Sequence, residues 1–212
     1  MASSTLDRHV RSATEEIDRA LRFLAPPTVR ARSRRIDGAD WEALHESEQQ
    51  LVAAAVAKRR HEFATGRVLL RHVLGYEGPI GIEPSRAPSW PAGTRGSLAH
   101  DRHVAVAAVT RDPSIIAIGI DVEPTALLSP EMAEVILRPE ERSLDAHLAF
   151  ALKEATYKAW SALGGRMLDH HDVLVAAQDG RFRALVVKDG VPFDGAYVTI
   201  DERMVALVVV TA

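Results

Sequence analysis

The chain of 212 residues contains no cysteine. This absence excludes disulfide bonds, thiolate metal ligands and a cysteine nucleophile. Any chemistry that the protein performs must therefore use carboxylates, imidazoles and amines.

Long apolar runs are also missing. The sequence has no stretch of about 18 apolar residues that could span a bilayer. Its first ten residues, Met1 to Val10, lack the apolar core of a signal peptide. We therefore expect a cytoplasmic protein that has no membrane partner.

Neither sign of charge predominates strongly. The formal net charge of −3 is too small to predict a general attraction to nucleic acids or membranes. Arginines nevertheless gather in residues 19–35 and 58–71, where local basic patches could hold a small polyanion. With 47% hydrophobic residues and too little Pro, Gly and Ser for disorder, the chain can form one large domain or two small ones.

The N-terminal half predicts helices and one strand. Apolar residues spaced three and four apart predict an amphipathic helix over Thr5–Leu24. Small or apolar residues alternate with arginines over Thr28–Ile36, which is typical of a strand with one solvated face. A capping box made by Ser47 and Gln50 predicts one long helix that stops at Gly75.

The rest of the chain mixes both kinds of element. The stretch Gly78–Gly96 is rich in Pro and Gly and is expected to be a loop. Strands at Val104–Val109 and Ser114–Val122 are expected to pair around a turn at Asp112–Pro113. Further helices are expected at Ser129–Val135 and Leu144–Leu163, and two or three strands around Val173–Ala176, Phe182–Val187 and Tyr197–Val210. This mixed order predicts the α+β class.

One strand end carries two acids on the same side. Side chains alternate along a strand, so Ala117, Gly119, Asp121 and Glu123 share a face opposite to the isoleucines of residues 116–120. The small residues leave room for something bulky, and two adjacent carboxylates suit a hard divalent cation such as Mg²⁺. The alternative is a solvated strand end whose acids pair with arginines.

The later helix offers a third carboxylate. Glu154 and Lys158 are four residues apart, so they lie on one face of the helix. By themselves they indicate an ordinary surface ion pair. A role beside Asp121 and Glu123 requires support from a wider pattern.

That pattern is a set of blocks in a fixed order. Residues 119–123, Gly-Ile-Asp-Val-Glu, and residues 153–159, Lys-Glu-Ala-Thr-Tyr-Lys-Ala, resemble the two signature blocks of the 4′-phosphopantetheinyl transferase superfamily. Residues 58–67, Lys-Arg-Arg-His-Glu-Phe-Ala-Thr-Gly-Arg, resemble a block of its single-chain members, which serve siderophore, peptide and polyketide synthases. Residues 86–91, Arg-Ala-Pro-Ser-Trp-Pro, and 96–100, Gly-Ser-Leu-Ala-His, resemble two more. Each block alone is a weak signal, whereas the set in register is specific.

The resemblance implies a metal and a catalytic helix. Asp121, Glu123 and Glu154 would hold Mg²⁺, with Mn²⁺ as the alternative ion, against the pyrophosphate of coenzyme A. Glu154 would be the general base for a serine of the partner protein, directly or through a water, and Lys158 would neutralise charge on the transferred phosphate. Asp121, Glu154 and Lys158 are thus the candidate catalytic residues.

The resemblance also implies a cationic site for coenzyme A. Arg59 and Arg67 are eight residues apart on a helix and would grip phosphate oxygens, with Arg86 and Lys158 adding further contacts. His100 would contact a phosphate as a donor or a cation. Any one of these arginines could instead belong to a solvated helix face.

Two positions depart from the family's pattern. Ala99 stands where a serine or threonine usually precedes the histidine, so a hydroxyl contact to coenzyme A is lost. Asp101 follows the histidine, where an uncharged residue is more usual, and it adds negative charge near the expected phosphate site. Both changes are expected to weaken cofactor binding.

The family's architecture implies two similar halves with pseudo-twofold symmetry and a cofactor cleft between them. Here the halves would be residues 1–108, with the phosphate-binding arginines, and 109–212, with the metal site and catalytic helix, in a monomer. The partner would be an apo acyl or peptidyl carrier protein. Leu127, Leu128 and Met132 would meet its apolar patch, or would simply pack under a loop.

Two other functions remain open from the sequence. A degenerate relative could bind coenzyme A or a carrier protein without transfer, as the departures at Ala99 and Asp101 suggest. A magnesium-dependent phosphohydrolase could use the same acids with water as the nucleophile. The order of the motifs favours the transferase, which would release 3′,5′-ADP.

Overall fold

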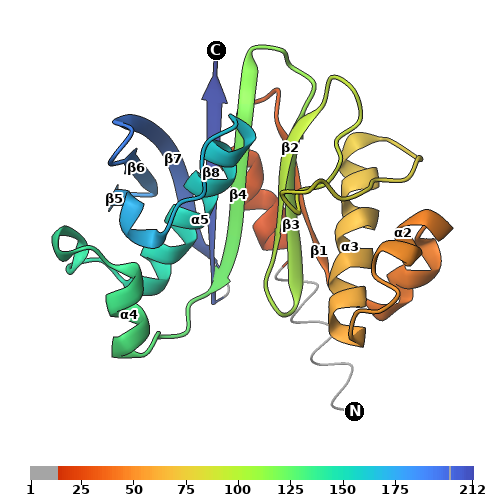
Figure 1. Ribbon diagram of the computed structural model, residues 1–212, viewed down its shortest axis with the longest axis horizontal. Coiled ribbons are helices and arrows are strands. Elements are labelled where there is room, and N and C mark those ends of the chain that lie inside the picture. The colour runs from red at the N-terminus through yellow and green to blue at the C-terminus, as the bar shows by residue number, and fades with distance from the viewer. Residues whose placement is uncertain (1–13, 201) are drawn as a thin grey trace. The chain divides into compact units, whose positions relative to one another are not determined.

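The computed structural model describes residues 14–200 and 202–212 (Figure 1). The chain divides into two compact units, Met1–Pro113 and Ser114–Ala212. Our predicted boundary after residue 108 falls inside a strand, β3, that spans Val104–Thr110. Each unit contains helices and one antiparallel sheet, so the chain is a mixed α/β protein with two sheets.

The first unit packs a long helix on a three-stranded sheet. The strands are in the order β1-β3-β2, with bounds Arg30–Arg35 for β1 and Arg95–His100 for β2. The long helix, α3, spans Ala57–Leu74, and its leucines share an apolar core with β3. Before it lie a 3-10 helix, η1, at Gly38–Ala43 and a short helix, α2, at Glu46–Leu51.

Several expectations for this unit are confirmed. Residues 14–24 are helical, whereas the expected start at Thr5 lies outside the described residues. In β1, Ala31 is buried while Arg30 and Arg34 are exposed, as the alternation predicts. Gly75 ends α3 with a left-handed φ of 58°, which glycine adopts without strain. Strand β2 was not anticipated.

The single long helix predicted from residue 47 is wrong. Two helices form, and the capping box uses His45 and Glu48 instead of Ser47 and Gln50. The Glu48 carboxylate accepts the backbone N–H of His45 at 3.0 Å and pairs with Arg71 at 2.7 Å. This buried tertiary contact holds α2 as a separate turn of helix, which no local pattern reveals.

The second unit packs two helices with a five-stranded sheet in the order β4-β8-β7-β6-β5. Its helices are α4 at Pro130–Ile136 and α5 at Ala146–Ala162, close to the predicted positions. Short 3-10 helices, η2 and η3, lie at Pro139–Glu141 and His170–Asp172. The strands are β4 Ile115–Pro124, β5 Val173–Gln178, β6 Arg181–Val186, β7 Val191–Ile200 and β8 Arg203–Thr211.

Two predictions about the strands are wrong, one about pairing and one about the extent of a strand. Strands β3 and β4 do not form a hairpin, because β3 pairs with β1 and β2 while β4 pairs with β8. The single strand expected over Tyr197–Val210 is the hairpin β7-β8, which turns beside Glu202 at a φ of 60°. Strand partners are chosen by tertiary packing, so the sequence pattern finds strands more readily than their neighbours.

Across residues 14–200 and 202–212, no helix is both long and apolar enough to cross a bilayer.

Candidate active site

Helix α5 lies directly against strand β4. A Cβ atom added at Gly119 would be only 1.8 Å from the carbonyl oxygen of Ala155 and 2.8 Å from the nitrogen of Ala159. The room left by the small residues of β4 is therefore filled by the helix backbone itself. This close approach sets the acids of β4 beside the polar side chains of α5.

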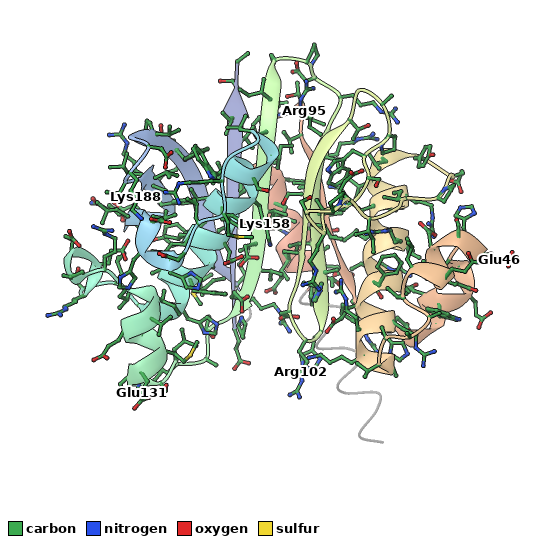
Figure 2. All side chains as sticks on the ribbon, in the orientation of Figure 1. Glu46, Arg95, Arg102, Glu131, Lys158 and Lys188 are labelled. Atoms are coloured by element: carbon green, nitrogen blue, oxygen red, sulfur yellow. The ribbon has the colours of Figure 1, made fainter. Side chains whose placement is uncertain are left out.

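Lys158 and Asp121 form the centre of this contact. The Lys158 ammonium donates to Asp121 Oδ1 at 2.6 Å and to the carbonyl of Ile120 at 3.0 Å, from the side of α5 that faces β4 (Figure 2). Lys158 thus reaches across to the strand, which an ordinary surface pair with Glu154 would not require. Asp121 pairs with a lysine and lies 4% exposed, so the alternative of a solvated strand end is wrong for this residue.

Glu123 is held by a histidine that the sequence analysis missed. His147 Nδ1 donates to the carbonyl of Ala126 at 2.5 Å, and its Nε2 lies 3.4 Å from Glu123 Oε2. The available signal was spacing, because His147 precedes Glu154 by seven residues, or two helical turns. The imidazole ties the end of β4 and the following segment to α5.

The charge of Asp121 opposes the ionisation of both Glu123 and Glu154. Burial raises the pKa of Glu123 to about 7, and the charge of Asp121 adds to this effect while His147 opposes it. Burial also raises the pKa of Glu154, again with a contribution from Asp121 and opposition from Lys158. A bound cation would relieve this repulsion.

The residues fit a divalent cation that is shared with a phosphate ligand. Asp121 Oδ2 is buried and has no hydrogen-bond partner among the described residues. Those residues contain no ready-made group of three or more acidic or imidazole ligands. Mg²⁺ commonly takes only one or two carboxylates together with substrate phosphates and waters, so a protein cage is not required.

The raised pKa of Glu123 predicts a pH-dependent stability of the metal-free protein. Between pH 4.5 and about 7 the unfolded Glu123 loses its proton before the folded one does, so stability falls as the pH rises. Glu123→Gln should therefore raise the melting temperature above pH 7 and change it little near pH 4.5. Thermal melts in chelator test this, and a difference that does not vary with pH would contradict it.

In the first unit, Arg59 and His100 are brought together. Arg59 Nη1 donates to His100 Nε2 at 3.2 Å, and both lie within 4 Å of the buried Glu62 carboxylate, at 3.6 and 3.7 Å. His100 ends β2 and Arg59 lies in the first turn of α3, so residues that are 41 apart in sequence meet. Glu62 was not singled out by the sequence analysis, although it belongs to the same block.

Arg67 is placed differently from Arg59. Arg67 is only 3% exposed, and its Cζ lies 4.3 Å from the centre of the Phe63 ring. Its guanidinium donates to the carbonyls of Ile80 and Gly81 at 2.7 and 2.8 Å. Burial lowers its pKa to about 10, which leaves it charged at neutral pH. The geometry favours support of the loop over direct contact with a phosphate.

That loop presents Arg86. A bridge between Ile82 and Pro88 closes it, and Arg86 sits at its tip, exposed and with a φ of 70°. A left-handed arginine is uncommon, and such conformations cluster at functional sites. Arg67 therefore supports, through residues 80 and 81, the turn that carries Arg86.

The two departures from the family's pattern have structural accounts. Ala99 is 5% exposed within β2, where a small side chain packs. Asp101 accepts the backbone N–H groups of His103 and Val104 at 2.5 and 2.6 Å, which closes the turn between β2 and β3. Its carboxylate thus stabilises a turn.

Comparisons with known proteins find a family and several relatives that the chain resembles. A model of the 4′-phosphopantetheinyl transferase N-terminal domain matches residues 47–110, and a model of the 4′-phosphopantetheinyl transferase superfamily matches residues 117–201. The 4′-phosphopantetheinyl transferase Svp of Streptomyces mobaraensis is 38% identical over 157 residues, which cover 66% of this chain and 64% of that protein. The 4′-phosphopantetheinyl transferase PptT of Mycobacterium tuberculosis is 35% identical over 172 residues, 72% of this chain and 76% of that protein. Enterobactin synthase component D of Escherichia coli (strain K12) is 34% identical over 117 residues, which cover 48% of this chain and 55% of that protein.

Proposed function

Because the chain belongs to the 4′-phosphopantetheinyl transferase superfamily, we propose that it transfers phosphopantetheine from coenzyme A to a serine of an acyl or peptidyl carrier protein. The products would be the holo-carrier protein and 3′,5′-ADP. The observation that carries the proposal is the pairing of Lys158 with the buried Asp121, whose second carboxylate oxygen has no hydrogen-bond partner among the described residues.

We propose that Asp121, Glu123 and Glu154 hold Mg²⁺, or Mn²⁺ in its place. When bound, the ion supplies charge stabilisation to the pyrophosphate oxygens. Glu154 takes the proton of the carrier serine while the serine oxygen forms a bond to the phosphorus next to the pantetheine. The bond from that phosphorus to the bridging oxygen breaks, and 3′,5′-ADP leaves with the electron pair. Lys158 neutralises charge that develops on the phosphate.

Phosphate binding is assigned to both units. Arg59, hydrogen-bonded to His100, supplies one guanidinium, Arg86 adds an exposed one, and Lys158 contributes from α5. Arg67 acts indirectly, through the loop that it supports. The cofactor cleft and the twofold relation between similar halves, expected from the resemblance, stay part of this proposal.

The two arginines should respond differently to substitution. Arg59→Ala is expected to weaken coenzyme A binding about tenfold, as loss of a charge-assisted contact does, with little change in stability. Arg67→Met should lower the melting temperature, because two carbonyls lose their buried donor. Calorimetric titration and thermal melts on both variants separate these effects. If both variants lost the same affinity for coenzyme A and Arg67→Met were not destabilised, Arg67 would be a direct phosphate ligand.

The carrier protein is proposed to dock on the surface formed by Leu127, Met132 and Val135. These residues are 89%, 48% and 57% exposed; Met132 and Val135 lie on helix α4, and Leu127 precedes it. Leu128, in contrast, is partly buried and packs against the core. Exposed apolar side chains gathered around one helix suit the apolar face of a partner helix. We propose that the enzyme works on this partner as a monomer in the cytoplasm.

Intact mass of purified apo-carrier proteins tests the whole proposal. Incubation with the chain, coenzyme A and Mg²⁺ should add one phosphopantetheine, about 340 Da, and a chelator should prevent the addition. No addition to any carrier, with coenzyme A still bound, would favour the degenerate binding protein. Release of 3′,5′-ADP without a carrier would favour the phosphohydrolase.

A further inference from the structure

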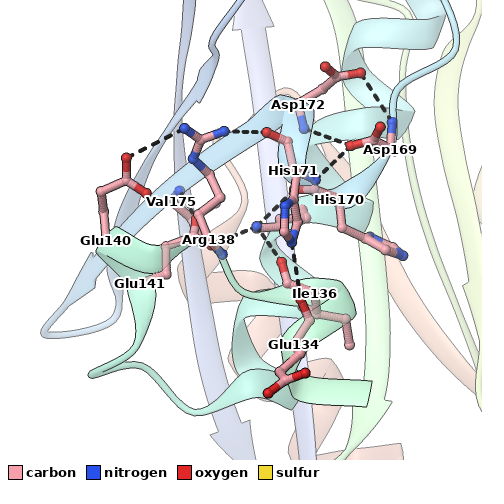
Figure 3. A network of polar contacts seen from close by, with 11 residues as sticks. Glu134, Ile136, Arg138, Glu140, Glu141, Asp169, His170, His171, Asp172 and Val175 are labelled. Carbon is pink, nitrogen blue, oxygen red and sulfur yellow. Dashed lines mark hydrogen bonds and ion pairs between the residues drawn. The ribbon is translucent and has the colours of Figure 1, made fainter. Parts of the chain in front are cut away.

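A lysine in the signature block is buried rather than presented to a ligand. Lys153 is 2% exposed and its ammonium has three donors, all of which are used. It donates to Glu141 Oε2 at 2.6 Å and to the carbonyls of Ile136 and His170 at 2.7 and 2.8 Å. Figure 3 shows Glu141, Ile136 and His170 gathered at this point from separate segments.

The partner carboxylate extends the network. Glu141 is 1% exposed, accepts the backbone N–H of Val175 at 2.6 Å with one oxygen, and accepts that of Arg138 at 2.8 Å with the other (Figure 3). His171 also donates to the carbonyl of Glu134 in α4 at 3.2 Å. One ion pair therefore joins α5 to the end of α4, to η2, to η3 and to the start of β5.

Stability alone is a poor reason for this pair. Desolvation of two buried charges largely cancels their attraction, so an apolar pair of similar volume would commonly stabilise as well. Directional hydrogen bonds from a single ammonium do what apolar packing cannot, because they fix the distances between the segments that they join. The chain segments fixed here include the last residue of α4, Ile136.

We propose that Lys153 and Glu141 are a positioning pair that holds α4 in register with α5, so that a carrier protein docked on α4 presents its serine to Glu154. The inference rests on the proposed function. Lys153 precedes Glu154 on α5, whereas the proposed docking surface has Met132 and Val135 on α4 and Leu127 just before it. The pair thus links the end of the helix that carries the proposed docking surface to the helix that carries Glu154.

The test is a double variant that removes both charges, Lys153→Met with Glu141→Gln. Lys153→Met alone would leave a buried, unpaired carboxylate and could fail to fold. In the double variant the glutamine oxygen can still accept the N–H of Val175. The KM for the carrier protein is expected to rise about tenfold, with kcat at saturating carrier and the affinity for coenzyme A retained.

Hydrogen exchange gives a second readout that needs no carrier protein. Peptides over residues 129–138 should exchange about tenfold faster in the double variant, while those over β4 and β8 keep their protection. The matched control is the exposed pair of β6 and β7, Arg183→Met with Asp194→Asn, whose side chains are 79% and 80% exposed. The control should change neither readout.

An unchanged KM in a folded double variant overturns the inference, as does unchanged exchange over α4. A fall in kcat together with coenzyme A affinity also overturns it, because the pair would then support the whole unit. If the unaltered chain modifies no carrier, the proposed function fails, and the exchange measurement still decides whether the pair positions α4.

Discussion

Glu154→Gln is expected to lower kcat by a factor of about 10² to 10⁴, the range that loss of a general base commonly gives. The amide cannot take the serine proton, and it is a weaker ligand for a divalent ion. Coenzyme A should still bind in part, because Arg59, His100 and Lys158 remain. Time courses of carrier mass and calorimetric titration of coenzyme A measure the two effects.

The loss should not come from unfolding. Burial raises the pKa of Glu154, so ionisation of this side chain costs stability in the folded protein, and a neutral amide removes that cost. The melting temperature should stay level or rise. Glu42→Gln, on an exposed acid of η1, is a matched control with the same change of atoms. Full activity in the Glu154 variant would remove the mechanism.

Gly119→Ala is expected to destabilise the second unit by about 3 kcal/mol or more, at the upper end of overpacking costs. The added methyl group would lie 1.8 Å from the carbonyl oxygen of Ala155, so the backbone of α5 would have to move away from β4. That movement would also separate Asp121 from Lys158. Urea denaturation measures the loss of stability, and transfer assays measure the loss of activity in the folded fraction.

A suitable control is Gly81→Ala. There the nearest neighbour of the added methyl group is the hydroxyl of Ser89 at 3.3 Å, and only a small adjustment is required. Its free energy of unfolding should stay within about 1 kcal/mol of the parent, as ordinary surface changes do. If Gly119→Ala is tolerated equally well, the contact between strand and helix is looser than the structure shows.

For the second unit, the sequence predicted which faces the candidate residues share better than it predicted their contacts. Alternation along residues 116–123 placed Asp121 and Glu123 on one face, and helical spacing placed Glu154 and Lys158 together. The partner of Lys158 is Asp121, 37 residues away, and no periodicity encodes such a contact. It follows from the fit of α5 against Gly119, which depends on three-dimensional packing.

Burial explains most of what the sequence could not show. The motif letters make Arg59 and Arg67 look equivalent, yet one is partly exposed beside His100 and the other is enclosed beneath a loop. Glu48 looks like a helical surface acid but is buried against Arg71, and this interrupts the predicted helix. Charged residues are almost never fully buried unless paired, and the pairing partners are distant in sequence.

Strand β4 carries Asp121 and Glu123 at one edge of its sheet, where it pairs with β8. Helices α4 and α5 and the three strands β5, β6 and β7 lie between β4 and β8 in the sequence, so β4 pairs with a strand that is distant along the chain. Contacts so far apart in sequence form slowly, because closing a long loop costs entropy before any contact offsets it. A chain that ended before residue 203 would contain every motif block but would lack the strand pairing that holds its acids. Activity should thus appear late in folding, and substitutions in β8 that touch no cofactor should delay it.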